Sequence, residues 1–441
     1  KVKKKVLTVI CSECTKPLGD FKDHDKLRGS VACCKKLQNL QQNFESGFFI
    51  INVDFTFQVR RILENLEEQL KQPRLDNLKV DLIDGELYKS FPKNSLTFTM
   101  YCDRIPLSNS SRKGALPVLL FVNELPKYLR FKHPILCSIY VGELSNISEK
   151  SLLGYTSNIL TQLENGLEYY SANFQQTKFK SCYLLAVVAD SPQRAHLRNV
   201  KQFNSYDGCD WCLVQAKQYK MVRSMVYLLQ ETNLNLRTHD QMKEIASKKE
   251  SDKNYEPSFG VKGLTCFYNF HFDIVKGFSP DVLHSVYLGV TRLILTSITD
   301  SKYNKFKFYV NARNKEKLNK RLTSIRPCSL ISRKPRSTQL LKDWKGSEFQ
   351  NFLLYYSAIV LDGLVNDHYL THFLKLSKAI FLLTREAIDL DSISKAEKLL
   401  EAFVFDFYNL YPCHLHRYNV HILLHLGNAA RWLGPLQNHS S

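Results

Sequence analysis

One continuous apolar run constrains the fold of this chain more than any other segment. Residues 182–188 read CYLLAVV, and Asp190 follows them after a single alanine. A short run of this kind predicts a buried strand. Helical periodicity precedes it over residues 148–170 and resumes just after it. Further strands are predicted within residues 76–143, where turn signals separate the apolar runs LKVDLID, SLTFTMYC, ALPVLLFV and HPILCSIYVG.

The order of these segments predicts an α/β fold. Residues 48–75 change from β-like to helical periodicity, and the C-terminal part of the chain is mainly helical. Such an order is typical of an α/β core interrupted by a mostly helical insertion. We expect the core over residues 48–200, the insertion over 201–340 and helices that complete the core over 341–441. A small Cys-bearing module is expected over 1–47.

The charge of the chain favours a polyanionic partner. The 441 residues include 61 Lys and Arg against 42 Asp and Glu, which gives a formal net charge of +19. A surplus of this size favours nucleic acid or an anionic surface, and the alternative is a solubility surplus spread evenly over the molecule. No apolar run reaches the roughly 18 residues that a membrane span needs, and no signal peptide is recognisable. We therefore expect no membrane partner.

Cysteine pairs suggest metal sites rather than disulfides, because the chain has the features of an intracellular protein. Cys11 and Cys14 form C-x-x-C, and Cys33 and Cys34 follow within the same Lys-rich segment. This segment has too few apolar residues for a core of its own, so a bound zinc ion would supply the missing stability. The adjacent second pair is unusual, and His24 is an alternative ligand.

A second C-x-x-C pair has possible partners near the C-terminus. Cys209 and Cys212 have the spacing that lets two thiolates share one tetrahedral metal, although a redox pair has the same spacing. His421 and His425 lie four residues apart, on one face of a predicted helix. The alternative is that both histidines are partly buried helix residues.

Three acidic residues have positions that suit metal-dependent phosphodiester chemistry. Such chemistry uses clustered carboxylates that hold two Mg²⁺ or Mn²⁺ ions. Asp84 ends a predicted strand, although Asp-Gly is also an ordinary turn signal. Asp190 ends the buried strand, where it could equally be a helix N-cap. Glu348 lies near the start of an apolar helix, where it could simply complement the helix dipole.

Several phrases together resemble a known family of enzymes. ADSPQRA, GCDWC and PDVLHSVYLGV occur in this order, flanked by LIDGELYKS near Ile83 and by GSEFQNFLLYYS after Gly346. They resemble the catalytic region of cut-and-paste DNA transposases of the CACTA (En/Spm-like) group. The resemblance implies an RNase H-like core and a catalytic triad of Asp84, Asp190 and Glu348 that binds Mg²⁺ or Mn²⁺.

The resemblance also implies a zinc site and a further active-site residue. Cys209, Cys212, His421 and His425 would form a Cys₂His₂ zinc site, similar to that in the catalytic subunit of the V(D)J recombinase. His284 belongs to the D-x-x-H phrase that such transposases share, and we expect it near the active site or the DNA. The alternative is a core histidine with Asp281 as its helix cap.

The expected function follows from this resemblance. We expect a DDE/D-type transposase that cleaves transposon ends and joins the freed 3′-hydroxyl to target DNA, acting in the nucleus on double-stranded DNA as a homo-oligomer. The Lys- and Arg-rich segment 302–336, with its interleaved aromatic residues, could contact phosphates, although such a run is often only a solvated helix face. The alternatives are a catalytically inactive, transposase-derived DNA-binding protein and a nuclease of the same fold.

Overall fold

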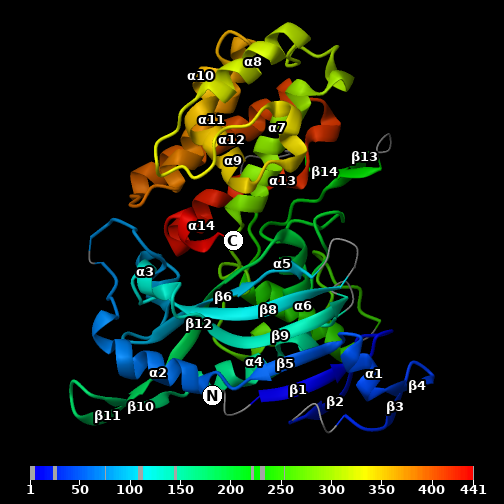
Figure 1. Cartoon of the computed structure of the whole chain (residues 1–441), viewed down its shortest axis with the longest axis vertical. Helices are drawn as coiled ribbons and strands as arrows, with labels where there is room; N and C mark the ends of the chain where they lie inside the picture. Colours follow the sequence, from blue (N-terminus) through cyan, green and yellow to red (C-terminus); the bar gives the residue numbers. More distant parts are fainter. Residues whose placement is uncertain are drawn as a thin grey trace.

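The chain forms a sheet-containing body and a helical body that lie against each other. The computed structural model describes residues 5–22, 27–74, 76–107, 113–143, 147–219, 223–228, 234–252 and 254–440. Figure 1 shows the sheet in the lower half, with its helices α4 and α6, and the helices α7 to α12 in the upper half. The C-terminal end of the chain lies between the two bodies. The chain is therefore a mixed α/β protein with a helical C-terminal part.

The sheet has eight strands in the order β12-β6-β8-β9-β5-β1-β2, with β7 paired to β8. All pairs are antiparallel except β12 with β6, which is parallel. The strands are β1 (Lys5–Ile10), β2 (Pro17–Phe21), β5 (Phe49–Val53), β6 (Leu96–Cys102), β7 (Ile105–Pro106), β8 (Lys113–Val122), β9 (Ile135–Glu143) and β12 (Cys182–Val188).

A third parallel segment extends the sheet beyond β12. Val187 of β12 forms a parallel bridge with Phe278, and its N–H donates to the carbonyl of Gly277 at 2.8 Å. On its other side, Val187 is paired with Met100 of β6. Met100, Val187 and Phe278 therefore form one row across three parallel segments, and all three side chains are buried.

The remaining elements surround this sheet or build the helical body. Three two-stranded ribbons are β3 (Ser30–Cys33) with β4 (Lys36–Asn39), β10 (Leu167–Ser171) with β11 (Gln176–Lys180), and β13 (Lys217–Tyr219) with β14 (Ser224–Val226). The helices before the helical body are α1 (Leu40–Glu45), α2 (Thr56–Leu66), α3 (Lys127–Arg130), α4 (Glu149–Glu164), α5 (Ser191–Leu197) and α6 (His239–Ser251).

The helical body begins with a π-helical segment, η6 (Leu283–Thr291), that continues directly into α7 (Arg292–Thr299). A second π-helical segment, η9 (Phe352–Tyr356), joins α9 to α10. The other helices are α8 (Ala312–Ser324), α9 (Gly346–Asn351), α10 (Ser357–Leu361), α11 (Asp367–Leu383), α12 (Leu390–Leu410), α13 (Tyr418–His421) and α14 (Leu426–Leu433).

The two hydrophobic cores divide the chain differently from the expected boundaries. The sheet core includes residues of the expected insertion as far as Phe278, whereas residues from Val282 onward join the core of the helical body. The strands β1 and β2 of the N-terminal module pair with the edge of the sheet instead of forming a separate body. The main change between cores thus falls between Phe278 and Val282, within the expected insertion. Five earlier residues of the insertion also belong to the core of the helical body: Cys209, Trp211, Cys212, Ala216 and Tyr227.

Most of the predicted elements are confirmed, with one exception near Asp84. The strands predicted from SLTFTMYC, ALPVLLFV, HPILCSIYVG and CYLLAVV correspond to β6, β8, β9 and β12, and the predicted helix before β12 corresponds to α4. The predicted strand LKVDLID is wrong. Lys79 makes only an isolated bridge to Ile388, and Leu82–Asp84 form a 3₁₀ turn. The carboxylates of Asp81 and Asp84 cap backbone N–H groups there, which stabilises a turn rather than a strand.

No helix among the described residues is long and apolar enough to cross a membrane.

A buried carboxyl group in the sheet provides a test of this core. Both side-chain oxygens of Glu124, two residues after the end of β8, accept from the Thr97 N–H at 3.0 Å. Burial raises the pKa of Glu124 to about 7, although the hydrogen bonds from Thr97 oppose the shift. At pH values between the pKa of Glu124 in the unfolded chain and its pKa in the folded chain, the folded chain keeps a proton that the unfolded chain releases. The free energy of unfolding therefore falls as the pH rises through this range, by roughly 3 kcal/mol in total.

Glu124→Gln removes this titration. We expect the free energy of unfolding of the variant, relative to that of the parent, to increase by roughly 2–3 kcal/mol between about pH 5 and about pH 8. Urea unfolding at the two pH values measures the difference. A difference between the two proteins that does not change with pH would contradict a buried, neutral Glu124.

Candidate functional site

Each of the three residues in the parallel row, Met100, Val187 and Phe278, is followed three positions later in the sequence by an aspartate. Asp103 comes three residues after Met100, Asp190 three residues after Val187, and Asp281 three residues after Phe278. Neighbouring strands lie about 4.8 Å apart, and parallel strands end at the same edge of a sheet. The three aspartates therefore lie at one edge, at the carboxyl ends of adjacent segments.

The three aspartates differ in exposure and in hydrogen bonding. Asp103 is exposed, and Asp190 is half-buried. One carboxylate oxygen of Asp190 caps α5 by accepting from the Gln193 N–H at 2.8 Å, so the N-cap expected as an alternative role is present. Asp281 is buried, and its oxygens accept from the Leu283 N–H at 2.9 Å and from the Ser440 hydroxyl at 2.7 Å.

His284 lies beside these carboxylates. Its Nδ1 contacts the second oxygen of Asp281, and its side chain remains 37% exposed. The hydrogen bond to Asp281 raises the pKa of His284 above its usual value, burial opposes the shift, and the charges of Asp281, Asp190 and Asp103 add to it. The imidazole thus gains positive charge at the edge where the aspartates meet. The structure shows His284 in contact with Asp281, and its expected position near an active site or DNA stays a prediction.

Asp84 has a different environment. Its carboxylate accepts from the backbone N–H groups of Arg74 at 2.8 Å and of Val80 and Asp81 at 3.0 Å. It is buried in the turn that packs near α14, and the nearby Gly85 approaches the Trp432 carbonyl so closely that a Cβ would lie 2.1 Å from it. The carboxylate is therefore engaged in holding this loop. Among the described residues, Asp84, Asp190 and Glu348 do not form a group whose ligand atoms all lie within 4.8 Å of one another, and the expected triad stays a prediction.

Glu348 is also used locally. It is the third residue of α9, where its carboxylate accepts from the Lys345 N–H at 2.8 Å. Arg336 donates to both of its oxygens at 2.7 Å. Burial by itself would raise the pKa of Glu348, but the hydrogen bonds from Arg336 and Lys345 and the charges of Arg336 and Arg333 together outweigh it and lower the pKa. Glu348 thus caps a helix and anchors a basic loop, which is close to the dipole role expected as its alternative.

Asp103 was not among the residues expected from the sequence. It directly follows SLTFTMYC, the run that forms β6, so its signal was an acidic residue at the end of a predicted strand. The same signal identified Asp190. The three carboxylates form a looser set than the cysteine sites, because among the described residues only the two cysteine-containing groups bring three or more ligand atoms within 4.8 Å.

The predicted Cys₂His₂ group does converge. Sγ of Cys209 lies 3.5 Å from Nε2 of His425, Sγ of Cys212 lies 3.3 Å from Nε2 of His421, and the two sulfur atoms are 3.5 Å apart. All four side chains are buried, and their ligand atoms lie within 4.8 Å of one another. Two thiols and two imidazole nitrogens in this arrangement fit a tetrahedral zinc ion.

An ion network joins this group to the helix that follows Asp190. Asp210, between the two cysteines, is buried and contacts Arg194 at 2.5 Å and Arg198 at 3.1 Å. The Tyr418 hydroxyl donates to the other oxygen of Asp210 at 2.7 Å. Burial by itself would raise the pKa of Asp210, but the charges of Arg194 and Arg198 outweigh it and lower the pKa to about 2.

The network joins two of the sequence phrases in space. Arg194 belongs to ADSPQRA and Asp210 to GCDWC, and they form one buried ion pair. Arg194 also donates to the Ser279 carbonyl at 3.1 Å, two residues before Asp281. The pair therefore links α5, the loop 208–212 (the cysteine loop) and the segment that carries Asp281.

The N-terminal cysteines form a second compact group. The ligand atoms of Cys11, Cys14, Cys33 and Cys34 lie within 4.8 Å of one another and could hold a metal ion such as zinc. His24, the alternative ligand, lies outside the described residues.

No family model matches this chain, and no curated protein matches it significantly in sequence.

Removing the charge of Asp210 tests the network. Asp210→Asn leaves two buried guanidinium groups without a counter-charge, so we expect the free energy of unfolding to fall by roughly 3–5 kcal/mol. Urea unfolding followed by circular dichroism measures the change. Glu401→Gln on the exposed side of α12 is the control and should change stability by less than about 0.5 kcal/mol. Equal effects of the two substitutions would contradict a structural role for Asp210.

Proposed function

We propose that this protein is a metal-dependent DNA-cleaving and strand-transferring enzyme of the DDE/D transposase type. The proposal depends mainly on one observation, the row Met100–Val187–Phe278 followed at equal distance by Asp103, Asp190 and Asp281. Carboxylates at the carboxyl ends of adjacent strands are a usual position for metal ligands in α/β sheets.

The strand order supports an RNase H-like core as part of this proposal. The antiparallel strands β6, β8 and β9 are consecutive in the sheet, and β12 then returns beside β6 in parallel after the helix α4. The α4 helix packs against β5, β9 and β12. The extra strands β5, β1 and β2 extend the sheet beyond β9, and the segment at Phe278 extends it beyond β12.

Asp103 and Asp190 have a different role from His284 in this proposal. Asp103 and Asp190 would hold Mg²⁺ or Mn²⁺, which activates the attacking oxygen and stabilises the leaving oxygen of the phosphodiester. Asp281, whose oxygens already have three partners, orients His284. The imidazole, with its raised pKa, can donate a hydrogen bond to a phosphate oxygen at this edge.

A cationic cavity on the same helix fits a DNA backbone. The continuous helix from η6 to α7 begins beside His284 and passes a cavity of about 320 Å³. Arg292, Lys302 and Arg417 line this cavity. Arg292 follows His284 by eight residues along this helix, so both cations can face the same DNA backbone.

The basic segment 302–336 has a more distant position. Its helix α8 lies at the end of the helical body away from the sheet (Figure 1). Tyr303 and Phe308 are buried in the helical core, whereas most of its Lys and Arg side chains are exposed. We propose that this surface contacts a more distant part of a double-stranded DNA partner, through charge rather than through stacking. Homo-oligomerisation when active and a nuclear location belong to the same proposal.

One observation favours the alternative of a catalytically inactive DNA-binding protein. Glu348, expected as the third catalytic carboxylate, is bound by Arg336, and Asp281 is buried against Ser440. In the row, only Asp103, which is exposed, and Asp190, which is half-buried, are thus accessible for metal binding. An inactive protein would keep the basic surfaces and the zinc group but would not cut DNA.

Nicking of supercoiled DNA by the full chain separates these functions. In low salt with Mn²⁺ or Mg²⁺ we expect nicking that falls by roughly 10²–10³-fold in Asp103→Asn and in Asp190→Asn, because each loses several kcal/mol of charge stabilisation. Asp84→Asn, compared at equal folded fraction, should keep activity within about threefold, and Glu401→Gln should be unchanged. Loss of activity in Asp84→Asn alone would contradict the proposed row. DNA binding without metal-dependent nicking would favour the inactive protein.

A further inference from the structure

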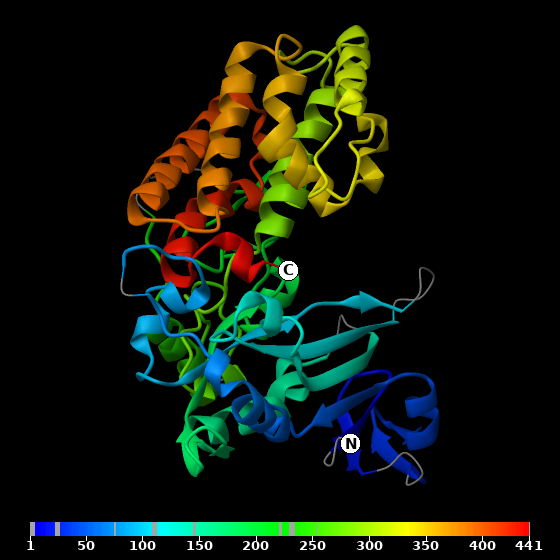
Figure 2. The ribbon, with the colours of Figure 1, turned by 60° about the vertical axis from the view of Figure 1, so that its left-hand side comes forward.

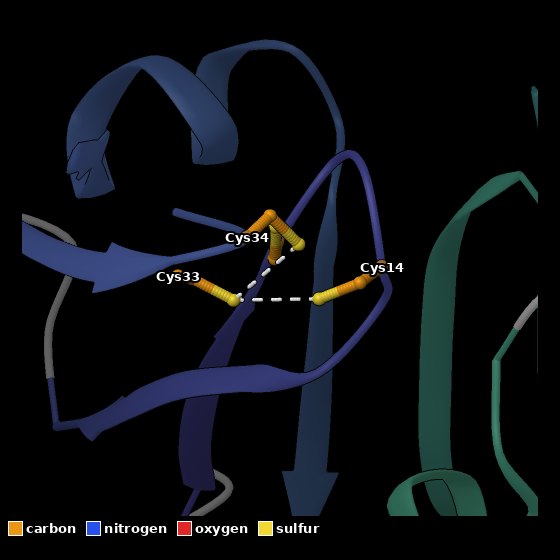
Figure 3. A group of neighbouring side chains, drawn as sticks. Cys14, Cys33 and Cys34 are labelled. Atoms are coloured by element: carbon orange, nitrogen blue, oxygen red, sulfur yellow. Dashed lines mark hydrogen bonds between the residues drawn. The ribbon is translucent and has the colours of Figure 1, made fainter. Parts of the chain in front are cut away.

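The N-terminal cysteines have the geometry of a tetrathiolate metal site. The sulfur atoms of Cys14 and Cys33 lie 3.3 Å apart, those of Cys11 and Cys34 3.9 Å apart, and those of Cys33 and Cys34 3.9 Å apart. Four thiolates at the zinc–sulfur distance of 2.3 Å give sulfur–sulfur distances of about 3.8 Å in a tetrahedron. Figure 3 shows the side chains of Cys14, Cys33 and Cys34 turned toward one another from two separate turns.

The backbone turns at both cysteine pairs favour this arrangement. Thr15, directly after Cys14, has a φ of 58°, and Cys34 and Lys35 have φ values of 53° and 59°. A left-handed conformation costs a residue other than glycine roughly 1–2 kcal/mol. Three such residues at two facing turns indicate that the turns need a compensating interaction. The turn after Cys33 directs the adjacent thiol of Cys34 toward Cys11, so both members of this unusual pair reach the centre.

Apolar packing alone is a weak source of stability for this module. Among the described residues, its hydrophobic cluster has four buried members, Leu7, Val9, Leu27 and Leu40, and the residues packed against them are only partly buried. A segment of about 45 residues rarely folds on such a core without a metal or disulfides. All twelve cysteines of the chain are free, and the shortest of these sulfur–sulfur distances is well above the 2.05 Å of a disulfide.

We propose that Cys11, Cys14, Cys33 and Cys34 bind one Zn²⁺ ion that holds the strand pair β1–β2 at the edge of the central sheet. Cys11 directly follows β1, and its N–H donates to the Lys16 carbonyl just before β2, so the site closes the β1–β2 turn. Cys33 ends β3 and brings the β3–β4 ribbon against this turn. The ion thus fastens the β3–β4 ribbon to the β1–β2 turn.

A zinc ion at the N-terminal cysteines should exchange with solvent faster than one at the Cys₂His₂ group. Cys34 is exposed and Cys14 and Cys33 are half-buried, whereas all four side chains of the Cys₂His₂ group are buried. A chelator reaches exposed sulfur atoms without local unfolding, but must wait for local opening at a buried site. Zinc should therefore leave the full chain in two phases, and the first should come from the N-terminal site.

Zinc content per chain gives the first test. Purified full-length protein should contain about two zinc ions, and Cys14→Ser combined with Cys34→Ser should contain about one. Cys328→Ser is the matched control, because Cys328 is exposed and belongs to neither group, and it should keep about two. A double variant that still holds two ions would overturn the proposal.

A second measurement uses the unmodified chain and does not depend on the folding of a variant. A chelator with a zinc-sensitive dye is added, the thiols are alkylated after the first release phase, and the labelled cysteines are found by mass spectrometry. Labelling of Cys11, Cys14, Cys33 and Cys34, with Cys209 and Cys212 protected, is the expected result. The proposal would be overturned if Cys209 and Cys212 were labelled first, or if the chain released one ion in a single phase. Recovery of Cys14 and Cys33 as a disulfide would also overturn it.

Discussion

The parallel pairing of three segments is the constraint on which the rest of this structure depends. Met100, Val187 and Phe278 can form one row only if the chain crosses the sheet twice between them, because parallel neighbours need long connections. The first crossing includes β8, β9 and α4, and the second includes α5, the cysteine loop and α6. The aspartates meet at one edge as a direct consequence, without any attraction between their like charges.

The second crossing is the longer one, and buried polar groups fix it. Asp210 is charged and fully enclosed, so its two arginines and Tyr418 must stay in place to offset the desolvation of the carboxylate. The neighbouring Cys209 and Cys212 face His421 and His425 from the helical body. Trp211, between Asp210 and Cys212, stacks on Trp432 at 5.3 Å. The cysteine loop therefore connects the sheet edge to the helices through three kinds of contact.

Local patterns in the sequence predicted much of this, and non-local pairing explains what they missed. The strands around Asp190 follow from apolar runs, and the spacing within each Cys or His pair indicates possible ligands, because both signals are local. The joining of the two pairs into one Cys₂His₂ group was implied by the family resemblance. Asp84 had the same strand-end pattern, but capping of neighbouring amides turned LKVDLID into a 3₁₀ loop. Asp103 becomes notable only once β6 is known to lie parallel to β12. Glu348 likewise depends on Arg336, whose position no periodicity indicates.

The most direct test of the central claim maps the divalent metal itself. Fe²⁺ is bound in place of Mg²⁺ and generates hydroxyl radicals that cleave the nearby backbone, and excess Mg²⁺ serves as the competitor. The account predicts Mg²⁺-sensitive cleavage near residues 103, 190 and 281–284, from three distant parts of the chain. Cleavage near residues 84 and 348, or cleavage that Mg²⁺ does not reduce, would contradict a metal site at the ends of β6 and β12.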